Sequence, residues 1–146
     1  MGEPEAETLL MVDGAARGNP GEAGCGAVIV DEAGEVVKEL SCYLGHATNN
    51  VAEYEGLLLG LQALLDLEKK NIRVQSDSQL LVRQLNGQYR VKDEKLKRLF
   101  ERAVNLLRRF DKVRIVHVPR ELNRHADRLA NQGIDQVLRR KRAKAD

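Results

Sequence analysis

The pattern of apolar and polar residues changes along this chain from strand-like runs to helical periods and back. Residues 7–13 are apolar on both alternating faces, which is typical of a central strand buried on both sides. A glycine-rich turn over residues 14–21 follows, and two further strand-like runs then flank a four-residue turn that contains Gly34. This pattern predicts three antiparallel strands over residues 7–13, 25–30 and 35–44.

Helical patterns dominate the rest of the chain. Thr48, Asn49 and Asn50 are residue types that cap helices, and a long helical period follows them. We predict helices over residues 51–69, 78–85, 92–110 and 124–138, and strands over residues 71–77 and 112–118. The resulting order, β-β-β-α-β-α-α-β-α, predicts an α/β fold in which helices cover a five-stranded mixed sheet.

Length and composition fit one domain. The chain has 146 residues, of which 42% are apolar and 32% charged, so we expect a single domain over residues 1–146 with its core at about residues 8–138. No apolar run approaches the roughly 20 residues of a membrane span, and the acidic start is unlike a signal peptide. We therefore expect a cytoplasmic protein without membrane contact. Cys25 and Cys42 are expected to be free thiols, with a single disulfide left open.

The distribution of charge is more informative than the net charge of +2. The first seven residues carry three glutamates, whereas residues 139–142 are all arginine or lysine and Lys144 follows them. This basic C-terminal tail has two explanations that the sequence leaves open. It could bind nucleic-acid phosphates, or it could be a solvated helix end whose cations are favoured by the helix dipole.

Three aspartates lie at ends of the predicted elements. Asp13 ends the first strand, Asp77 ends the strand over residues 71–77, and Asp127 lies in the first turn of the last helix, at the edge of its apolar face. Each one also has an ordinary structural explanation. Asp13 could begin a turn, Asp77 could cap the next helix, and Asp127 could be favoured by the dipole of its helix.

The helical period separates two glutamates at the start of the long helix. Glu53 shares its face with glycines and leucines that are expected to pack on the sheet. Glu55 lies on a more mixed face and is expected to be solvated. Glu53 is therefore the glutamate that we expect to join the three aspartates, although either residue would also favour the helix N-terminus electrostatically.

Four acids can meet at one place only if cations lie between them. Like charges about 4 Å apart in a partly buried site repel by several kcal/mol. Magnesium is a hard cation that takes oxygen ligands, and two such ions about 3.5–4 Å apart form the clamp used in phosphoryl chemistry. The chain has no cysteine–histidine cluster with zinc spacing and no phosphate-binding lysine motif, so the acids themselves indicate a magnesium site.

Four short motifs resemble the type 1 ribonuclease H family, and together they span about residues 9–134. The motifs are Asp13-Gly followed by Gly18-Asn-Pro-Gly21, Thr48-Asn-Asn-Val-Ala-Glu53, Ser76-Asp-Ser-Gln79, and Asn123-Arg-His-Ala-Asp127-Arg-Leu-Ala130. Each motif is short, but all four in this order and at compatible spacing are specific. The resemblance implies the ribonuclease H fold and hydrolysis of the RNA strand of RNA–DNA hybrids. The implied ligands of two Mg²⁺ ions, with Mn²⁺ as a possible substitute, are Asp13, Glu53, Asp77 and Asp127.

The resemblance also implies substrate contacts. Asn19, Asn49 and Gln79 stand where family members contact the minor groove of the hybrid, partly through RNA 2′-hydroxyl groups. Amide side chains suit this task because they both donate and accept hydrogen bonds. Ordinary explanations stay open: Asn19 precedes a proline in a turn, Asn49 could cap a helix, and Gln79 could simply be exposed.

The chain departs from the family pattern in two places. Some members carry a basic protrusion with tryptophans between the short and the long helix, but this chain has no tryptophan. We therefore expect Tyr89, Arg90, Lys92 and the basic tail to contribute to substrate binding. A mobile histidine that aids product release also lacks a clear counterpart. His117 lies in an apolar strand and is expected to be structural, whereas Arg120 in the following loop is the better candidate for a phosphate contact.

The favoured function is an endoribonuclease, expected as a monomer, that acts on RNA–DNA hybrids. One alternative is another nuclease of the same fold that cleaves double-stranded RNA or DNA, since a fold does not define a substrate. The other is a non-catalytic hybrid-binding or protein-interaction module. The complete set of four acids argues against this module, because pure binding would favour lysines at those positions.

Overall fold

Three antiparallel strands form the first half of the sheet. The structure, a computed structural model, describes residues 6–145. The strands β1 (Thr8–Gly18), β2 (Gly21–Val30) and β3 (Val36–Ala47) follow one another as two hairpins. Gly34 has a φ of 84° in the second turn, a conformation that glycine adopts without the steric cost that other residues meet. The predicted antiparallel arrangement is confirmed.

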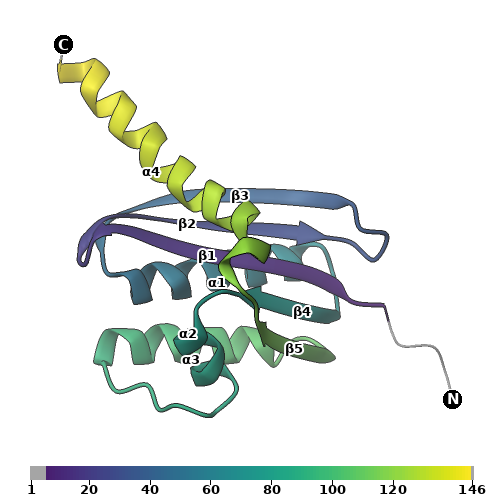
Figure 1. Cartoon of the computed structure of the whole chain (residues 1–146). Coiled ribbons are helices and arrows are strands. Elements are labelled where there is room, and N and C mark those ends of the chain that lie inside the picture. The colour runs from purple at the N-terminus through teal and green to yellow at the C-terminus, as the bar shows by residue number, and fades with distance from the viewer. Residues whose placement is uncertain (1–5, 146) are drawn as a thin grey trace, which may run out of the picture.

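Two parallel strands complete the sheet on the other side of β1. The strands β4 (Asn71–Ser76) and β5 (Lys112–His117) give the order β3-β2-β1-β4-β5, so β1 is central (Figure 1). The parallel pairing of β1 with β4 runs only from Thr8 opposite Ile72 to Met11 opposite Gln75. Beyond Met11, β1 continues beside β2 alone, which leaves the carboxyl ends of β1 and β4 to diverge.

Helices cover both faces of this sheet. Helix α1 (Asn49–Asp66) packs against β1 and β2, and α3 (Glu94–Leu107) packs against the outer side of α1. The short α2 (Gln79–Leu85) lies beside β4 and β5. On the opposite face α4 (Arg124–Ala145) crosses β2 and β3, and its C-terminal part extends beyond the sheet (Figure 1). The 3₁₀ turn η1 (Arg120–Leu122) leads into α4.

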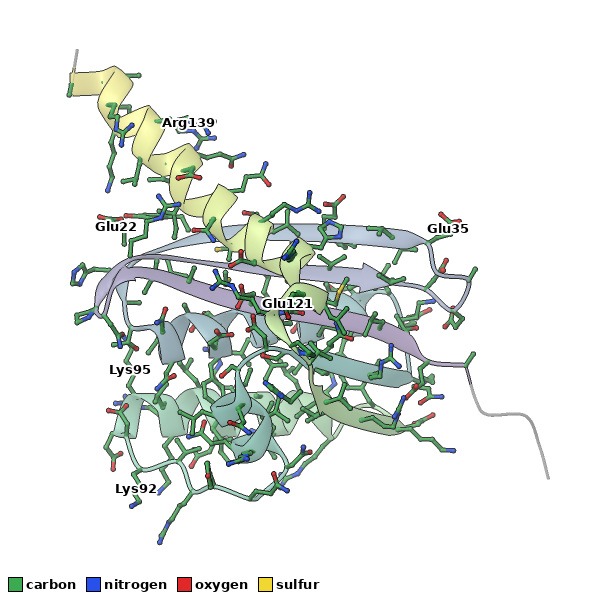
Figure 2. The ribbon with its side chains drawn as sticks, viewed as in Figure 1. Glu22, Glu35, Lys92, Lys95, Glu121 and Arg139 are labelled. Atoms are coloured by element: carbon green, nitrogen blue, oxygen red, sulfur yellow. The ribbon has the colours of Figure 1, made fainter. Side chains whose placement is uncertain are left out.

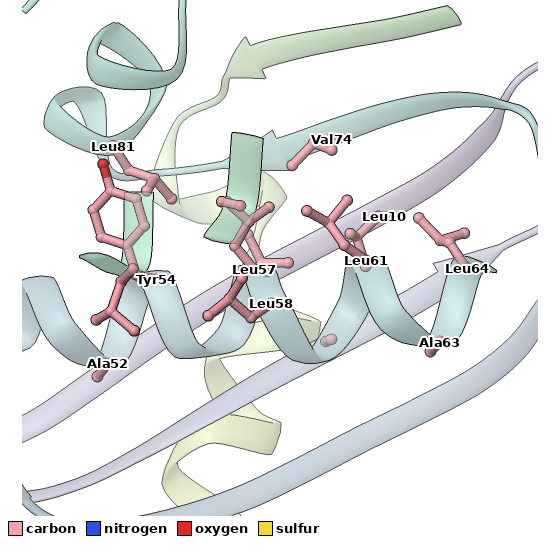
Figure 3. Packing of buried hydrophobic residues seen from close by; sticks show 14 of the residues in the cluster. Leu10, Ala52, Tyr54, Leu57, Leu58, Leu61, Ala63, Leu64, Val74 and Leu81 are labelled. Carbon is pink, nitrogen blue, oxygen red and sulfur yellow. The ribbon is translucent and has the colours of Figure 1, made fainter. Parts of the chain in front are cut away.

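The main core lies between the sheet and α1. Leucines of α1 such as Leu57 and Leu61 meet Leu10 of β1 and Val74 of β4, and all four side chains are fully buried (Figure 3). Tyr54 lies in the same core, where its hydroxyl group donates a 2.6 Å hydrogen bond to Gln84 of α2. A smaller apolar cluster beneath α4 contains Val28, Ala126 and Leu129, with Met11 of β1 packed against it. The predicted burial of β1 on both faces is therefore confirmed.

Two predicted boundaries were wrong. Asp13 does not end the first strand, because the residues predicted as a glycine-rich turn continue the pairing with β2 as far as Gly18 opposite Gly21. Small residues such as Gly14 and Ala15 suit a strand that another element approaches closely. The last helix does not end at residue 138 but continues to Ala145, because its arginines, lysines and alanines favour helix and no glycine or proline interrupts them.

The other predicted elements are confirmed to within a few residues. Thr48 caps α1, since its hydroxyl oxygen accepts a hydrogen bond from the backbone N–H of Val51. The two thiols, Cys25 and Cys42, are free. No helix within residues 6–145 is long and apolar enough to cross a membrane. Two of the three N-terminal glutamates and the last residue of the basic tail lie outside the described residues.

Candidate active site

Asp13 lies at the point where the central strands diverge. It follows the last β1–β4 pair by two residues and remains paired with Gly26 of β2. Its side chain is only 4% exposed. The Asp13 carboxylate therefore lies just beyond the carboxyl end of the β1–β4 pair, in the middle of the sheet. At this point β4 no longer runs beside β1, which leaves a gap between the two strands.

Glu53 reaches the same place from α1. The helix approaches β1 so closely that a Cβ atom on Gly14 would lie 2.2 Å from the carbonyl carbon of Ala52. In this contact the backbone N–H of Gly14 donates a 3.2 Å hydrogen bond to Oε2 of Glu53. Glu55 instead lines a separate cavity of about 240 Å³ with Cys25, Cys42 and other residues. The predicted inward direction of Glu53 is confirmed, whereas the expectation that Glu55 is solvated is wrong, because Glu55 is partly covered.

Asp77 enters from the end of β4. The cap of α2 is its neighbour Ser78, whose hydroxyl oxygen accepts a 3.2 Å hydrogen bond from the N–H of Leu81. Asp77 is therefore not needed as a helix cap. Its carboxylate joins those of Asp13 and Glu53 in a cluster whose ligand atoms all lie within 4.8 Å of one another.

The electrostatics of this cluster show an excess of negative charge. The pKa of Asp13 is raised to about 8, chiefly by burial and then by the negative charges of Asp77 and Asp127. Burial also raises the pKa of Glu53, and the charges of Asp13 and Asp77 add to this effect. The pKa of Asp77 is raised by burial and by Asp127, against opposing effects of Arg120 and His117. A divalent cation would relieve this repulsion, and all the donor atoms are hard carboxylate oxygens.

Asp127 lies at the rim of the cluster, on the first turn of α4. It is partly buried, as expected for the edge of the apolar face of the helix, and its charge contributes to the raised pKa values of Asp13 and Asp77. It is not one of the three mutually close carboxylates. The amide nitrogen of Asn131, one helical turn further, donates to both the carbonyl oxygen and Oδ1 of Asp127, at 3.1 and 3.3 Å.

Cations surround the rim. Arg120, Arg124 and Arg128 line a groove of about 680 Å³ together with Asp127 and Glu121. Figure 2 shows Glu121 on the turn that precedes α4, where this turn passes in front of the sheet. His117 is exposed at the end of β5, and its Nε2 lies 3.3 Å from the backbone oxygen of Asp77. This contact with the backbone is compatible with the structural role expected for His117, which stays a prediction.

The predicted substrate-binding amides lie on a neighbouring hairpin and on two helix starts. Oδ1 of Asn19 accepts a 3.1 Å hydrogen bond from the N–H of Asn49, and Oδ1 of Asn49 accepts a 2.9 Å bond from the N–H of Ala16. Asn49 follows the true cap, Thr48, so capping does not explain it. Gln79 is exposed at the first position of α2. The structure thus brings Asn19 and Asn49 together beside the loop that precedes α1.

Three further residues around the site were not singled out by sequence reasoning. Asn123 is fully buried, and its Nδ2 donates a 2.8 Å hydrogen bond to the carbonyl oxygen of Val12, next to Asp13. Asn131 contacts Asp127, and Arg17 contacts Asn131. Asn131 had a usable signal, because its spacing of four residues from Asp127 puts both side chains on one helix face. Asn123 had another, because it begins the fourth motif.

Comparisons with known proteins place this chain and its fold in one family. A family model described as "Reverse transcriptase-like" matches residues 11–133. The chain is 46% identical over 123 residues to ribonuclease HI of Halobacterium salinarum, which covers 84% of the chain and 62% of that protein. It is 40% identical over 141 residues to a bifunctional protein of Mycobacterium tuberculosis, which covers 96% of the chain but 39% of that protein. The chain thus spans less than two thirds of the length of these relatives.

A solved structure agrees with the sequence relatives. The crystal structure of LC11-RNase H1 in complex with an RNA/DNA hybrid superposes with a TM-score of 0.86 at 42% identity, over 90% of this chain and 99% of that one. The sheet order and the flanking helices described above are those of this neighbour's fold. The chain therefore belongs to the ribonuclease HI family.

Proposed function

We propose that this chain is an endoribonuclease that hydrolyses the RNA strand of RNA–DNA hybrids with the aid of two Mg²⁺ ions. The observation that carries the proposal is the meeting of Asp13, Glu53 and Asp77, from three different elements, with ligand atoms within 4.8 Å. Purely structural acids would be held apart or paired with cations, because unscreened like charges are costly in a buried place. Asp127 at the rim is proposed as the fourth ligand.

The carboxylates and the bound ions have separate tasks in this proposal. When bound, the ions lower the pKa of a water molecule and stabilise charge on the leaving oxygen of the phosphodiester. The protein supplies the oxygen ligands Asp13, Glu53, Asp77 and Asp127. Burial and the close packing of α1 on β1 keep the first two in place before any substrate arrives.

The surrounding polar side chains would orient the hybrid. We assign Asn19, Asn49 and Gln79 to the minor groove, where amide groups distinguish RNA by its 2′-hydroxyl. The Nδ2 groups of Asn19 and Asn49 have no hydrogen-bond acceptor among the described residues, so these donors are available to a ligand. Arg120, which already lowers the pKa of Asp77, would contact a phosphate near the site.

A solved neighbour supports the proposed substrate, and the sheet supports the proposal of one ribonuclease H domain. One solved neighbour of 42% identity is described in complex with an RNA/DNA hybrid. All strands within residues 6–145 belong to one sheet, which agrees with one ribonuclease H domain. We further propose that the protein is cytoplasmic and acts as a monomer.

One assay tests the function against its alternatives. Labelled RNA–DNA hybrid, RNA duplex and DNA duplex of the same sequence are incubated with the protein in Mg²⁺ or in EDTA. We expect cleavage of the RNA strand of the hybrid alone, and only with Mg²⁺. Cleavage of the RNA or DNA duplex instead would identify another nuclease of this fold, and binding without cleavage would identify a non-catalytic module.

A further inference from the structure

Asp127 differs from Asp13 and Glu53 in how it is held. Glu53 accepts a backbone N–H, and the buried Asp13 is enclosed by the sheet, but Asp127 is partly exposed at the rim. The backbone of α4 around it is fixed, because a Cβ atom on Gly26 would lie 2.4 Å from the carbonyl oxygen of Ala126. The orientation of the Asp127 carboxylate therefore depends on its side-chain torsions and on the groups that contact it.

A polar relay of two side chains, Arg17 and Asn131, reaches Asp127 from the hairpin between β1 and β2. The guanidinium of Arg17 donates through Nη2 to Oδ1 of Asn131 at 3.2 Å, and its Nη1 lies 2.7 Å from Oδ1 of Asp135. Because Oδ1 of Asn131 is occupied as an acceptor, its Nδ2 is turned toward Asp127 and donates to Oδ1 at 3.3 Å. An amide has one acceptor and one donor end. The donor Arg17 and the two acceptor oxygens of Asp127 therefore favour the same orientation of the Asn131 amide, with Nδ2 toward Asp127.

The same hairpin carries a proposed substrate contact. Arg17 is two residues from Asn19, and the backbone N–H of Ala16, near the end of β1, donates a 2.9 Å hydrogen bond to Asn49. The hairpin is therefore connected to α1 on one side and to α4 on the other. A shift of the hairpin when Asn19 engages a ligand would be transmitted through Arg17 to Asn131.

We propose that Arg17 and Asn131 are positioning residues that orient the carboxylate of Asp127 and link its orientation to the β1–β2 hairpin. This inference rests on the proposed function, since it assigns the relay a role in hybrid hydrolysis. Neither residue contacts the carboxylates of Asp13, Glu53 or Asp77 in the described part of the chain. Partners that orient a metal ligand typically change metal affinity or activity by about 10- to 100-fold when they are removed.

Steady-state kinetics with hybrid provide the first test. Asn131→Ala should lower kcat by about 10-fold or more, with KM for hybrid, and Kd for hybrid in EDTA, little changed. Gln132→Ala is the matched control, because Gln132 is the exposed neighbour on the same helix, and it should retain wild-type kcat. A rise in KM or Kd with unchanged kcat would show that Asn131 contacts the substrate and would overturn the proposal.

A double-mutant cycle tests the order of the relay. Arg17 is 40% exposed, so Arg17→Met should fold, and we expect it to lower kcat in the same way as Asn131→Ala. The double variant should be no slower than Asn131→Ala alone, because Arg17 acts only through Asn131. Effects that multiply, or an Arg17→Met variant that changes only KM, would refute the relay.

A measurement on the metal-free protein separates this inference from the proposed function. The Nδ2 resonances of Asn131 in a ¹H–¹⁵N NMR spectrum should shift in Asp127→Asn and in Arg17→Met, but not in Gln132→Ala. Absence of these shifts would refute the relay even in an active enzyme. Their presence in a protein that fails to cleave hybrid would leave the relay standing and would refute the proposed function.

Discussion

Single residues in and near the acidic cluster differ in their surroundings and therefore in their electrostatics. Asp13 and Glu53 are held by the backbone around them in a buried place. Burial disfavours their charged forms and therefore raises the pKa of both carboxyl groups. Glu55, two residues from Glu53, is turned to a separate cavity beside Cys25 and Cys42. Neighbours in sequence thus have opposite roles, because a helix rotates successive side chains by about 100°.

The two glutamates make the first prediction. Glu53→Gln keeps the size of the side chain but removes the ligand charge, so we expect cleavage of hybrid to fall by at least about 100-fold, with circular dichroism unchanged. Glu55→Gln should retain most of the activity. Loss of activity in Glu55→Gln and retention in Glu53→Gln would contradict the assignment of the two helix faces.

The second prediction concerns Asp13 and pH. Its pKa is about 8 in the folded protein, against 3.8 for an ordinary aspartate, so between these pH values the folded state keeps a proton that the unfolded state releases. The unfolding free energy of the metal-free protein should therefore fall as pH rises from about 4 to 8, as linkage requires. Asp13→Asn should remove part of this slope and raise Tm at pH 8 in EDTA.

Thermal denaturation in EDTA at a series of pH values measures this effect. Mg²⁺ should then raise Tm of the wild type more than that of Asp13→Asn. The wild type keeps the Asp13 carboxylate as a charged ligand, and the bound ion offsets its repulsion with the other acids. A marked decrease in Tm of Asp13→Asn at pH 8 would mean that Asp13 anchors β1 through its hydrogen bonds and that repulsion is minor.

At the scale of elements, α4 combines two functions along its length. Its first half carries Asp127 and packs on β2 through close backbone contacts at Gly24 and Gly26, and on β3 through Gly133. Its second half extends beyond the sheet, and Figure 2 shows Arg139 on this part. Lys141 turns back to Tyr43 of β3, with its Nζ 3.2 Å from the hydroxyl oxygen. The basic extension is therefore a helix anchored at one point and exposed elsewhere.

The third prediction concerns this extension. Deletion of residues 139–146 removes five cations, and we expect KM for hybrid to rise and its salt dependence to flatten while kcat changes little. The slope of log affinity against log salt should fall by about 0.9 for each phosphate that the shortened protein no longer neutralises, the value known for B-DNA.

A more conservative variant serves as its control. Replacement of Arg139, Arg140 and Arg142 by glutamine keeps the helix and the contact between Lys141 and Tyr43 but removes three of the five cations. It should therefore change KM in the same direction as the deletion, by a smaller amount. An unchanged KM across a salt series in both variants would show that the extension is only a solvated helix end.

For the whole molecule, the site depends on a sheet that is parallel in one half and antiparallel in the other. The antiparallel half lets β1 continue past Asp13, and the parallel half ends early and opens the gap in which the acids meet. Helix α1 on one face and α4 on the other then each contribute a carboxylate. No single element could hold this cluster.

The fourth prediction concerns the metal that completes the molecule. Hybrid cleavage should require Mg²⁺ or Mn²⁺ and be absent in Ca²⁺, whose longer and looser coordination fits in-line displacement poorly. Initial rates measured with each ion at equal concentration, with EDTA as the blank, test this expectation. Full turnover in EDTA would refute a metal-dependent mechanism.

The sequence by itself determined the features that depend on local periodicity. The order of the elements, the cap at Thr48 and the inward face of Glu53 all follow from patterns within a few residues, because helix and strand periods are set by the backbone. The motifs around the four acids were sufficient to indicate the family, which the comparisons confirm.

Only the tertiary structure decided which strands end where and which side chains meet. Asp13 lies in mid-strand because the pairing of β1 with β2 continues beyond the point where its pairing with β4 stops. The β1–β4 pairing joins residues about 60 positions apart, such as Thr8 and Ile72. The sequence pattern predicts that the last helix ends at residue 138, so the helical state of the basic extension and its anchor on Tyr43 were both decided by the structure. The contact of Arg17 with Asn131 spans 114 positions, and no local pattern carries information across such a distance.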